Sequence, residues 1–222
     1  MIVYKLKMKL LSDTTFGRGD GVAGLVDQEI EHDPNGFPYL RGRTLKGLLS
    51  EECDNLIAVL SPDIRQHWEK IASGLFGKPG SSLETIAQMH VGDACLPRDL
   101  REVIGYQIQW DNKLSEVDIL ESLTTIRRQT AINSATGVAE ERSLRSIRVI
   151  LRDLEFTAPL SFEIPPNEDT LTVLSVGVLA LRRVGSVRNR GLGYVQCRLF
   201  DAKNNEITTN YLERFGQVAK ES

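Results

Sequence analysis

The 222-residue sequence predicts an α+β fold with a ferredoxin-like β-α-β-β-α-β core. Three observations support this prediction. An alternating segment opens the chain, one helical segment follows it and another precedes the last strand, and further alternating segments lie between the helices and at the end. We expect a single domain over residues 1–222, with a long loop after the first strand and an inserted thumb-like hairpin at about residues 123–152.

The first predicted strand covers residues 2–11, where apolar residues alternate with Lys5, Lys7 and Lys9. Residues 12–38 follow with five glycines and two prolines. A connection of this length in a compact domain is either functional or disordered, and we treat it as a candidate functional loop.

The next elements are two helices and a strand. Residues 44–60 carry a leucine stripe at helical spacing, and Thr44 is the expected N-cap. A second helix is expected between Pro62 and Leu75, closed by glycines, and residues 87–96 are typical of a strand.

The second half of the chain continues with a hairpin. Residues 123–150 predict two extended, arginine-lined arms around a turn at residues 134–137, and residues 154–164 alternate as a strand. The best-marked helix follows, capped by Asn167, with Arg182 and Arg183 in its last turn and Gly185 at its C′ position. The final strand is "YVQCRLF", and we expect a turn and a short tail after it.

Composition excludes several classes of protein. Hydrophobic residues make up 41% of the chain and charged residues 26%, as in ordinary soluble domains, and the net charge of −3 argues against a protein that coats nucleic acid nonspecifically. The N-terminus lacks the apolar core of a signal peptide, and the longest apolar run, residues 171–181, is too short to span a bilayer. We therefore expect a cytoplasmic protein with no membrane partner. Three widely spaced cysteines predict buried thiols rather than disulfides or a zinc site.

Arginine is concentrated in two segments of this acidic chain. Residues 127–152 contain six arginines against two glutamates, and residues 182–200 contain five arginines and no acid. The planar guanidinium suits phosphate recognition, so these segments indicate a phosphate-binding groove within an assembly. The alternative, solvated arginine-rich faces, stays open.

Two basic loops adjoin predicted helices. Arg41, Arg43 and Lys46 lie where a helix begins, and its unpaired amides already carry partial positive charge, so cations there are unfavourable unless an anion binds. The second loop, residues 185–193, combines glycines with Arg188 and Arg190. Glycines let the backbone approach a ligand, and turn amides can form an anion-binding nest.

Several common catalytic and nucleotide-binding motifs are absent from the sequence. It contains no GxSxG nucleophile elbow and no Walker A motif, and its one candidate RNA-recognition strand has a single aromatic residue.

Five segments in order resemble the RAMP superfamily of CRISPR-associated proteins, and in particular the repeated backbone subunit of type III (Csm-type and Cmr-type) effector complexes. They are "GLVDQEIEHDPNGFPYLRGRTLKG" (24–47), "LFG" (75–77), "GDACL" (92–96), "RQTAINSATGVAEERSL" (128–144) and "GSVRNRGLGYVQC" (185–197).

This resemblance implies a specific activity. Such subunits stack along a CRISPR guide RNA, and their thumb hairpin interrupts the guide–target duplex. Catalytic members cut target RNA with an aspartate of the first long loop and a divalent metal, and Asp27 falls at that position. We therefore expect Asp27 to be both the catalytic residue and the metal ligand, with Mg²⁺, or another divalent cation such as Mn²⁺, as cofactor. The implied partners are guide RNA, target RNA, further copies of this chain and other effector subunits.

The resemblance also assigns an RNA-binding set, although two of its motifs depart from the family pattern. The expected RNA-binding residues are Arg41, Arg43, Lys46, Arg127, Arg128, Gly185, Arg188, Arg190, Gly191 and Gly193. The usual Pro-Gly-Ser-Ser is replaced by residues 41–44, Arg-Gly-Arg-Thr, and Leu192 stands at a position that is often aromatic.

Two other functions stay open. The chain could be a structural RNA-binding subunit in which Asp27 is only a turn residue. It could also be a metal-independent endonuclease that processes guide RNA and uses His32 as general acid or base. The absence of a second ferredoxin-like half argues against the processing enzyme.

Overall fold

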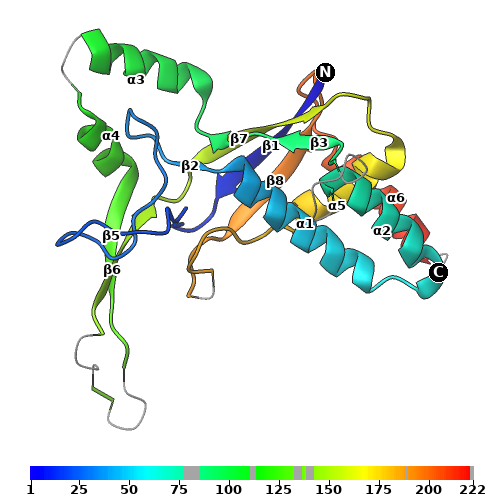
Figure 1. The fold of residues 1–222 in the computed structure, drawn as a ribbon, viewed down its shortest axis with the longest axis horizontal. Coiled ribbons are helices and arrows are strands. Elements are labelled where there is room, and N and C mark those ends of the chain that lie inside the picture. The colour runs from blue at the N-terminus through cyan, green and yellow to red at the C-terminus, as the bar shows by residue number, and fades with distance from the viewer. Residues whose placement is uncertain (78–85, 111–113, 133–136, 139–142, 189, 221–222) are drawn as a thin grey trace.

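The structure, a computed structural model, describes residues 1–77, 86–110, 114–132, 137–138, 143–188 and 190–220 (Figure 1). The strands are β1 (Ile2–Leu10), β2 (Tyr39–Leu40), β3 (Met89–Val91), β4 (Ala94–Cys95), β5 (Thr124–Gln129), β6 (Arg145–Ile150), β7 (Glu155–Phe162) and β8 (Val195–Phe200). The helices are α1 (Gly42–Ala58), α2 (Pro62–Phe76), α3 (Arg98–Trp110), α4 (Glu116–Leu123), α5 (Glu168–Ala180) and α6 (Thr208–Lys220).

The central sheet has the ferredoxin-like strand order. Strand β1 pairs antiparallel with β7 on one side and with β8 on the other, and β3 pairs antiparallel with β7. The spatial order β8-β1-β7-β3, with α1 and α5 in the two crossovers, is the order 4-1-3-2 of a β-α-β-β-α-β core. The predicted fold class is confirmed.

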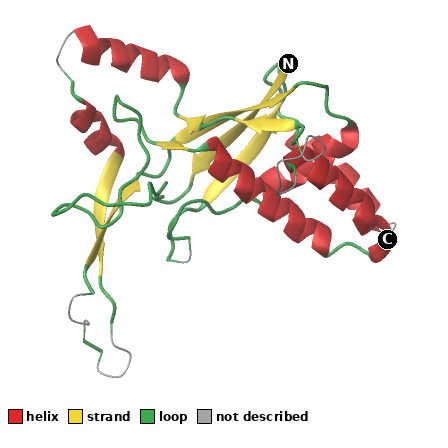
Figure 2. Cartoon of the chain, in the orientation of Figure 1, coloured by secondary structure: helices red, strands yellow, loops and turns green. Residues whose placement is uncertain are grey.

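The alternation of β1 determines which face of the sheet is covered. Leu6, Met8 and Leu10 are fully buried, whereas the lysines between them lie on the opposite face. Helices α1, α2, α5 and α6 gather on one side of the sheet (Figures 1 and 2). Helix α5 is buried along most of its length, and Gly177 allows α1 to approach so closely that a Cβ there would lie 2.3 Å from Cys53 Sγ.

The cysteine prediction holds for two of the three thiols. Cys53 and Cys197 are buried, and desolvation raises the pKa of Cys197 to about 12. Cys95 is only partly buried, and burial also raises the pKa of its thiol. All three are free thiols.

The strand predicted over residues 87–96 is interrupted. Its two parts, β3 and β4, both pair with β7, and the break falls at Gly92, where a Cβ would lie 2.6 Å from Pro159 Cγ. The break lets Asp93 reach the start of α1, where it accepts the Gly42 amide. Strand β2 then pairs with β4 and extends the sheet.

Several predicted helix ends are wrong. Helix α1 begins at Gly42 rather than Thr44, because the carboxylate of Asp93 caps it from another part of the chain. The cap of α5 at Asn167 is confirmed by a 2.8 Å hydrogen bond from the Thr170 amide, but the helix ends at Ala180, so Arg182 and Arg183 lie beyond it.

Three helices were not predicted. Helices α3 and α4 fill the middle insertion, and α6 replaces the expected tail. Helix α3 has no fully buried residue, and only Ile104 and Ile108 pack, partly buried, against the core.

The inserted hairpin is formed by β5 and β6, whose register pairs Thr124 with Ile150 and Gln129 with Arg145. It extends away from the sheet and helices (Figure 1). Residues 134–136 of the predicted turn at 134–137 lie outside the described residues. Within the described part of the chain, no helix is long and apolar enough to cross a membrane.

Candidate nucleic-acid interface

Asp27 lies against the root of the hairpin, by which we mean the paired strands β5 and β6. It belongs to a segment of the first loop that pairs with β6. Its amide donates to the Ser146 carbonyl over 2.8 Å, and the Ser146 amide donates to Asp27 Oδ2 over 2.6 Å. One residue further along, Gln28 forms a parallel bridge with Ile147. The loop aspartate is therefore fixed to the hairpin while its side chain stays exposed.

The preceding turn supports this position. Val22 and Val26 form a bridge, and a Cβ at Gly21 would lie 2.5 Å from the Val26 carbonyl oxygen. Only a residue without a side chain fits there, so the loop closes tightly before it reaches Asp27.

The carboxylate of Asp27 has limited capacity for a metal. Among the described residues, Oδ1 receives no hydrogen bond, and no cluster of three or more His, Cys, Asp and Glu side chains is placed to hold an ion. Neighbouring acids are engaged, because Glu29 binds Arg148 and Asp20 binds Arg18. Mg²⁺ keeps several waters and needs only one or two carboxylates beside a substrate phosphate, so Asp27 alone would fit an ion shared with a phosphate ligand rather than one held by the protein alone.

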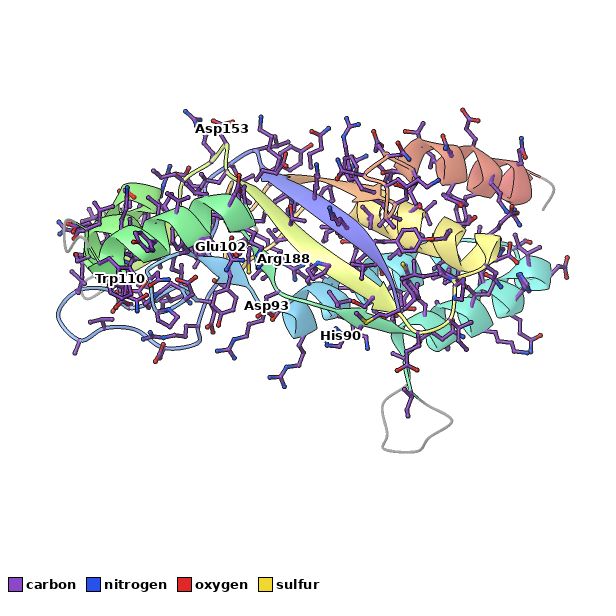
Figure 3. All side chains as sticks on the ribbon, turned by 90° about the horizontal axis from the view of Figure 1, so that it is seen from above. His90, Asp93, Glu102, Trp110, Asp153 and Arg188 are labelled. Atoms are coloured by element: carbon purple, nitrogen blue, oxygen red, sulfur yellow. The ribbon has the colours of Figure 1, made fainter. Side chains whose placement is uncertain are left out.

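The start of α1 is already occupied by a carboxylate. The Gly42 amide donates to Asp93 Oδ1 over 2.7 Å (Asp93 is labelled in Figure 3). A Cβ at Gly42 would lie 2.2 Å from the Val91 carbonyl oxygen, so this glycine is required for the close approach. The amides of Arg43 and Thr44 have no acceptor among the described residues and remain free for an anion.

The three predicted cations at this end differ in their surroundings. Arg41 binds Glu31 over 2.7 Å, and that carboxylate is largely buried. Arg43 is exposed without an ion-pair partner among the described residues. Lys46 is half-buried, and desolvation lowers its pKa, so an approaching phosphate would favour its charged form.

The glycine-rich loop forms the second cationic element. Gly185, Gly191 and Gly193 all have positive φ angles, and a Cβ at Gly193 would lie 2.0 Å from the Val184 carbonyl oxygen. The loop borders an open cavity of about 340 Å³, which is lined by Ser186, Val187, Arg188 and Arg190. Backbone and guanidinium groups therefore surround a space that an anionic ligand could enter.

This loop lies between α1 and the hairpin. Arg188 Nη1 is 3.9 Å from Glu51 of α1, and Arg190 Nη1 donates to Gln129 of β5 over 3.2 Å. Leu192, at the position expected to be aromatic, is buried against Ile147 and Val149 of β6. Leu192 thus attaches the loop to the hairpin instead of facing a ligand.

The two predicted hairpin cations have different roles. Arg127 forms an ion pair with Asp13, whose other oxygen accepts the Arg152 amide over 3.1 Å. Arg128 is exposed and has no ion-pair partner among the described residues. Arg127 therefore stabilises the hairpin root, whereas Arg128 is free to contact a ligand.

His32 is held in place by its neighbours. Its Nδ1 lies 3.2 Å from the Asp33 carbonyl oxygen and 3.4 Å from Glu116 Oε1. The ring lines a separate cavity of about 240 Å³ between the first loop and β4, together with Tyr39, Asp93 and Arg101. Of the other histidines, His67 lies 3.4 Å from Asp169 on the helical layer, and His90 is exposed on β3 (Figure 3).

The structure brings the predicted elements to one region and adds four residues that the sequence did not reveal. Asp27 and the glycine-rich loop both contact the hairpin root, and the same loop reaches α1. The four added residues are Asp93, which caps α1, Glu31, which pairs with Arg41, and the pair formed by Glu29 and Arg148. No local sequence pattern marks them, because each partner is distant in the sequence or lies in an irregular loop.

Comparison with known proteins identifies the family to which the chain belongs. The model of the RAMP superfamily matches residues 7–196, whereas no curated protein gives a significant match. A Type III-B Cmr-beta structure in the apo state aligns over 89% of this chain and 96% of its own, with 14% identity and a TM-score of 0.61.

Two further solved structures share the fold. Type III-B Cmr-beta bound to cognate target RNA covers 96% of this chain and 99% of its own (13% identity, TM-score 0.63). A chain of a Type IV-B CRISPR complex covers 90% and 91% (15% identity, TM-score 0.57). With the family match over most of its length, this chain belongs to the RAMP superfamily.

Proposed function

We propose that this chain is a guide-RNA-binding backbone subunit of a type III CRISPR effector complex and that it cuts target RNA at Asp27 with Mg²⁺ or Mn²⁺. The observation that carries the proposal is the fixation of Asp27 on a hairpin root that also contacts the cationic glycine-rich loop. The likeness to subunits of Cmr-beta, one of them bound to cognate target RNA, supports guide RNA, target RNA and other effector subunits as partners.

Guide phosphates are assigned to the cations that the fold leaves unpaired or only loosely paired. Arg188 lies 3.9 Å from Glu51, and among the described residues the Arg190 side chain donates only to the neutral amide of Gln129. Arg43 and Lys46 present their charges at the start of α1, and Arg188 and Arg190 line the cavity of the glycine-rich loop. Arg128 extends this surface along the hairpin. Arg41 and Arg127 already have carboxylate partners, so they add positive potential and contribute less direct contact.

The proposed cleavage uses the RNA's own 2′-hydroxyl as nucleophile. Attack on the adjacent phosphorus forms a 2′,3′-cyclic phosphate and releases a 5′-hydroxyl, so the protein must mainly hold the strand in line. Asp27 would hold the divalent ion, which when bound neutralises charge on the scissile phosphate. Fixation of Asp27 to Ser146 keeps the carboxylate at one position relative to the hairpin.

The test is cleavage of target RNA by the reconstituted guide-bound complex. Asp27→Asn, compared in Mg²⁺ and in EDTA, is expected to abolish metal-dependent cutting without loss of guide RNA. Asp20→Asn is the matched control, because Asp20 is an exposed aspartate of the same loop whose side chain binds Arg18 on the loop itself rather than the hairpin. Undiminished cutting by the Asp27 variant would refute the assignment.

A non-catalytic backbone subunit is the second candidate. It is favoured by one observation, namely that Asp27 Oδ2 already accepts the Ser146 amide, as a purely structural aspartate would. In that case Asp27→Asn would destabilise the hairpin root but leave any cleavage by the complex unchanged.

A further inference from the structure

The loop that carries Asp27 is joined to the hairpin by a buried ion pair. Arg148 Nε lies 2.9 Å from Glu29 Oε1 and 3.1 Å from Oε2, and the two residues are 7% and 3% exposed. Arg148 Nη1 also donates to Thr124 Oγ1 of β5 over 3.2 Å. The pair therefore connects the first loop to both arms of the hairpin.

Glu29 and Arg148 each follow one partner of the Asp27–Ser146 contact by the same number of residues. Glu29 is two residues after Asp27, and Arg148 is two residues after Ser146, on segments that run parallel. Because residues i and i+2 of an extended segment point to the same side, the ion pair follows the Asp27–Ser146 contact along the same ribbon. The Arg148 amide donates to the Gln28 carbonyl between them over 3.0 Å.

Neighbouring groups complete the connection. Glu29 Oε1 accepts the Ile30 amide over 2.9 Å, Thr15 Oγ1 donates to the Arg148 carbonyl over 3.3 Å, and Thr124 Oγ1 donates to the Leu120 carbonyl over 2.6 Å. A buried ion pair contributes little net stability compared with apolar side chains of similar volume, because both charges must be desolvated. The directional contacts of the ion pair do specify a single register of the first loop on β6. An exposed loop needs such contacts, because it has few apolar contacts to fix its position.

We infer that Glu29 and Arg148 are positioning residues, which hold the Asp27 loop in one register on the hairpin root. The inference rests on the proposed function only for its effect on cleavage. The effect on the loop itself follows from the contacts alone. Loss of the pair leaves Asp27 chemically intact but lets its segment separate from β6.

The first experiment measures amide hydrogen exchange of the full chain over residues 24–32 and 144–150. Arg148→Met is expected to accelerate exchange in both segments by at least tenfold. Glu102→Gln, which breaks the exposed Arg98–Glu102 pair of α3, is the control and leaves both segments unchanged. Unchanged protection in the Arg148 variant would overturn the inference whether or not Asp27 is catalytic.

The second experiment separates positioning from folding. The double variant Glu29→Met with Arg148→Met replaces the pair by apolar side chains and is expected to retain the wild-type melting temperature. In the guide-bound complex, its cleavage rate at saturating target RNA should fall by about a hundredfold, as expected if the Asp27 carboxylate is displaced by about 1 Å. The target concentration that gives half the maximal rate should not change.

The two measurements distinguish the two possible failures. If Asp27→Asn leaves cutting intact, the proposed function fails, while the exchange result still decides whether the pair positions the loop. A double variant that cuts at the wild-type rate, in a complex where Asp27→Asn is inactive, would overturn the positioning role.

Discussion

Replacement of the glycine-rich-loop cations tests whether this surface binds RNA phosphates. The variant Arg188→Gln with Arg190→Gln removes two charges that line the cavity. Each phosphate neutralised on a single strand contributes about 0.7 to the slope of log K against log salt, so two contacts contribute about 1.4. Between 50 and 200 mM salt, a fourfold change, wild-type affinity for guide RNA should therefore fall about sevenfold more than that of the variant.

The assay is a titration of fluorescent guide RNA at several salt concentrations. Arg98→Gln is the control, because Arg98 is an exposed arginine of α3 outside the loop and should leave the slope unchanged. Arg127→Gln should mainly lower the melting temperature, because Arg127 is paired with Asp13. An unchanged slope in the double variant, or an equal change in the Arg98 control, would refute the assignment of phosphates to this loop.

Three further predictions concern the glycine-rich loop and the start of α1. Gly193→Ala should destabilise the chain by about 1–3 kcal/mol, measured by denaturant unfolding, because φ is 77° and a Cβ would lie 2.0 Å from the Val184 carbonyl oxygen; a wild-type midpoint would contradict this. Asp93→Ala should cost about 0.5–2 kcal/mol through loss of the α1 cap, and the hydrogen-bonded Gly42 and Leu45 amides of the first turn should lose protection first in hydrogen exchange. Burial lowers the Lys46 pKa, so free protein loses this charge at a pH below the ordinary lysine range, and RNA binding then takes up a proton. Guide affinity should therefore decline as pH rises into that window, and Lys46→Arg should abolish the decline; an identical decline in both proteins would exclude Lys46 as its source.

Periodic segments made most of the fold predictable from the sequence. The alternation of residues 2–10 and the apolar run of α5 each match a single regular structure, so β1 and α5 were both predicted, α5 with its start correct and its end placed too late. Helix α3 was missed because its exposed face carries Val103, Tyr106 and Trp110, which obscures the amphipathic pattern. The start of α1 was misplaced because its cap, Asp93, comes from 51 residues away.

The candidate site was predictable only in its outline. Glycine and arginine spacing located the two basic loops, and the family resemblance singled out Asp27. The pairing of Arg127 with Asp13 and of Arg148 with Glu29 depends on how the first loop folds onto the hairpin, and an irregular loop has no period from which to derive those contacts. Arginine content alone therefore overstated the number of cations that are free to bind RNA.

The most direct test of the central claim uses complexes assembled from mixtures of wild-type and Asp27→Asn chains. If each copy carries its own cutting residue, the initial rate of target cleavage summed over all cut positions should fall in proportion to the fraction of variant chains and reach zero in the pure variant. Cleavage that is independent of this fraction would show that Asp27 does not cut the RNA and that the chemistry belongs to another residue or subunit.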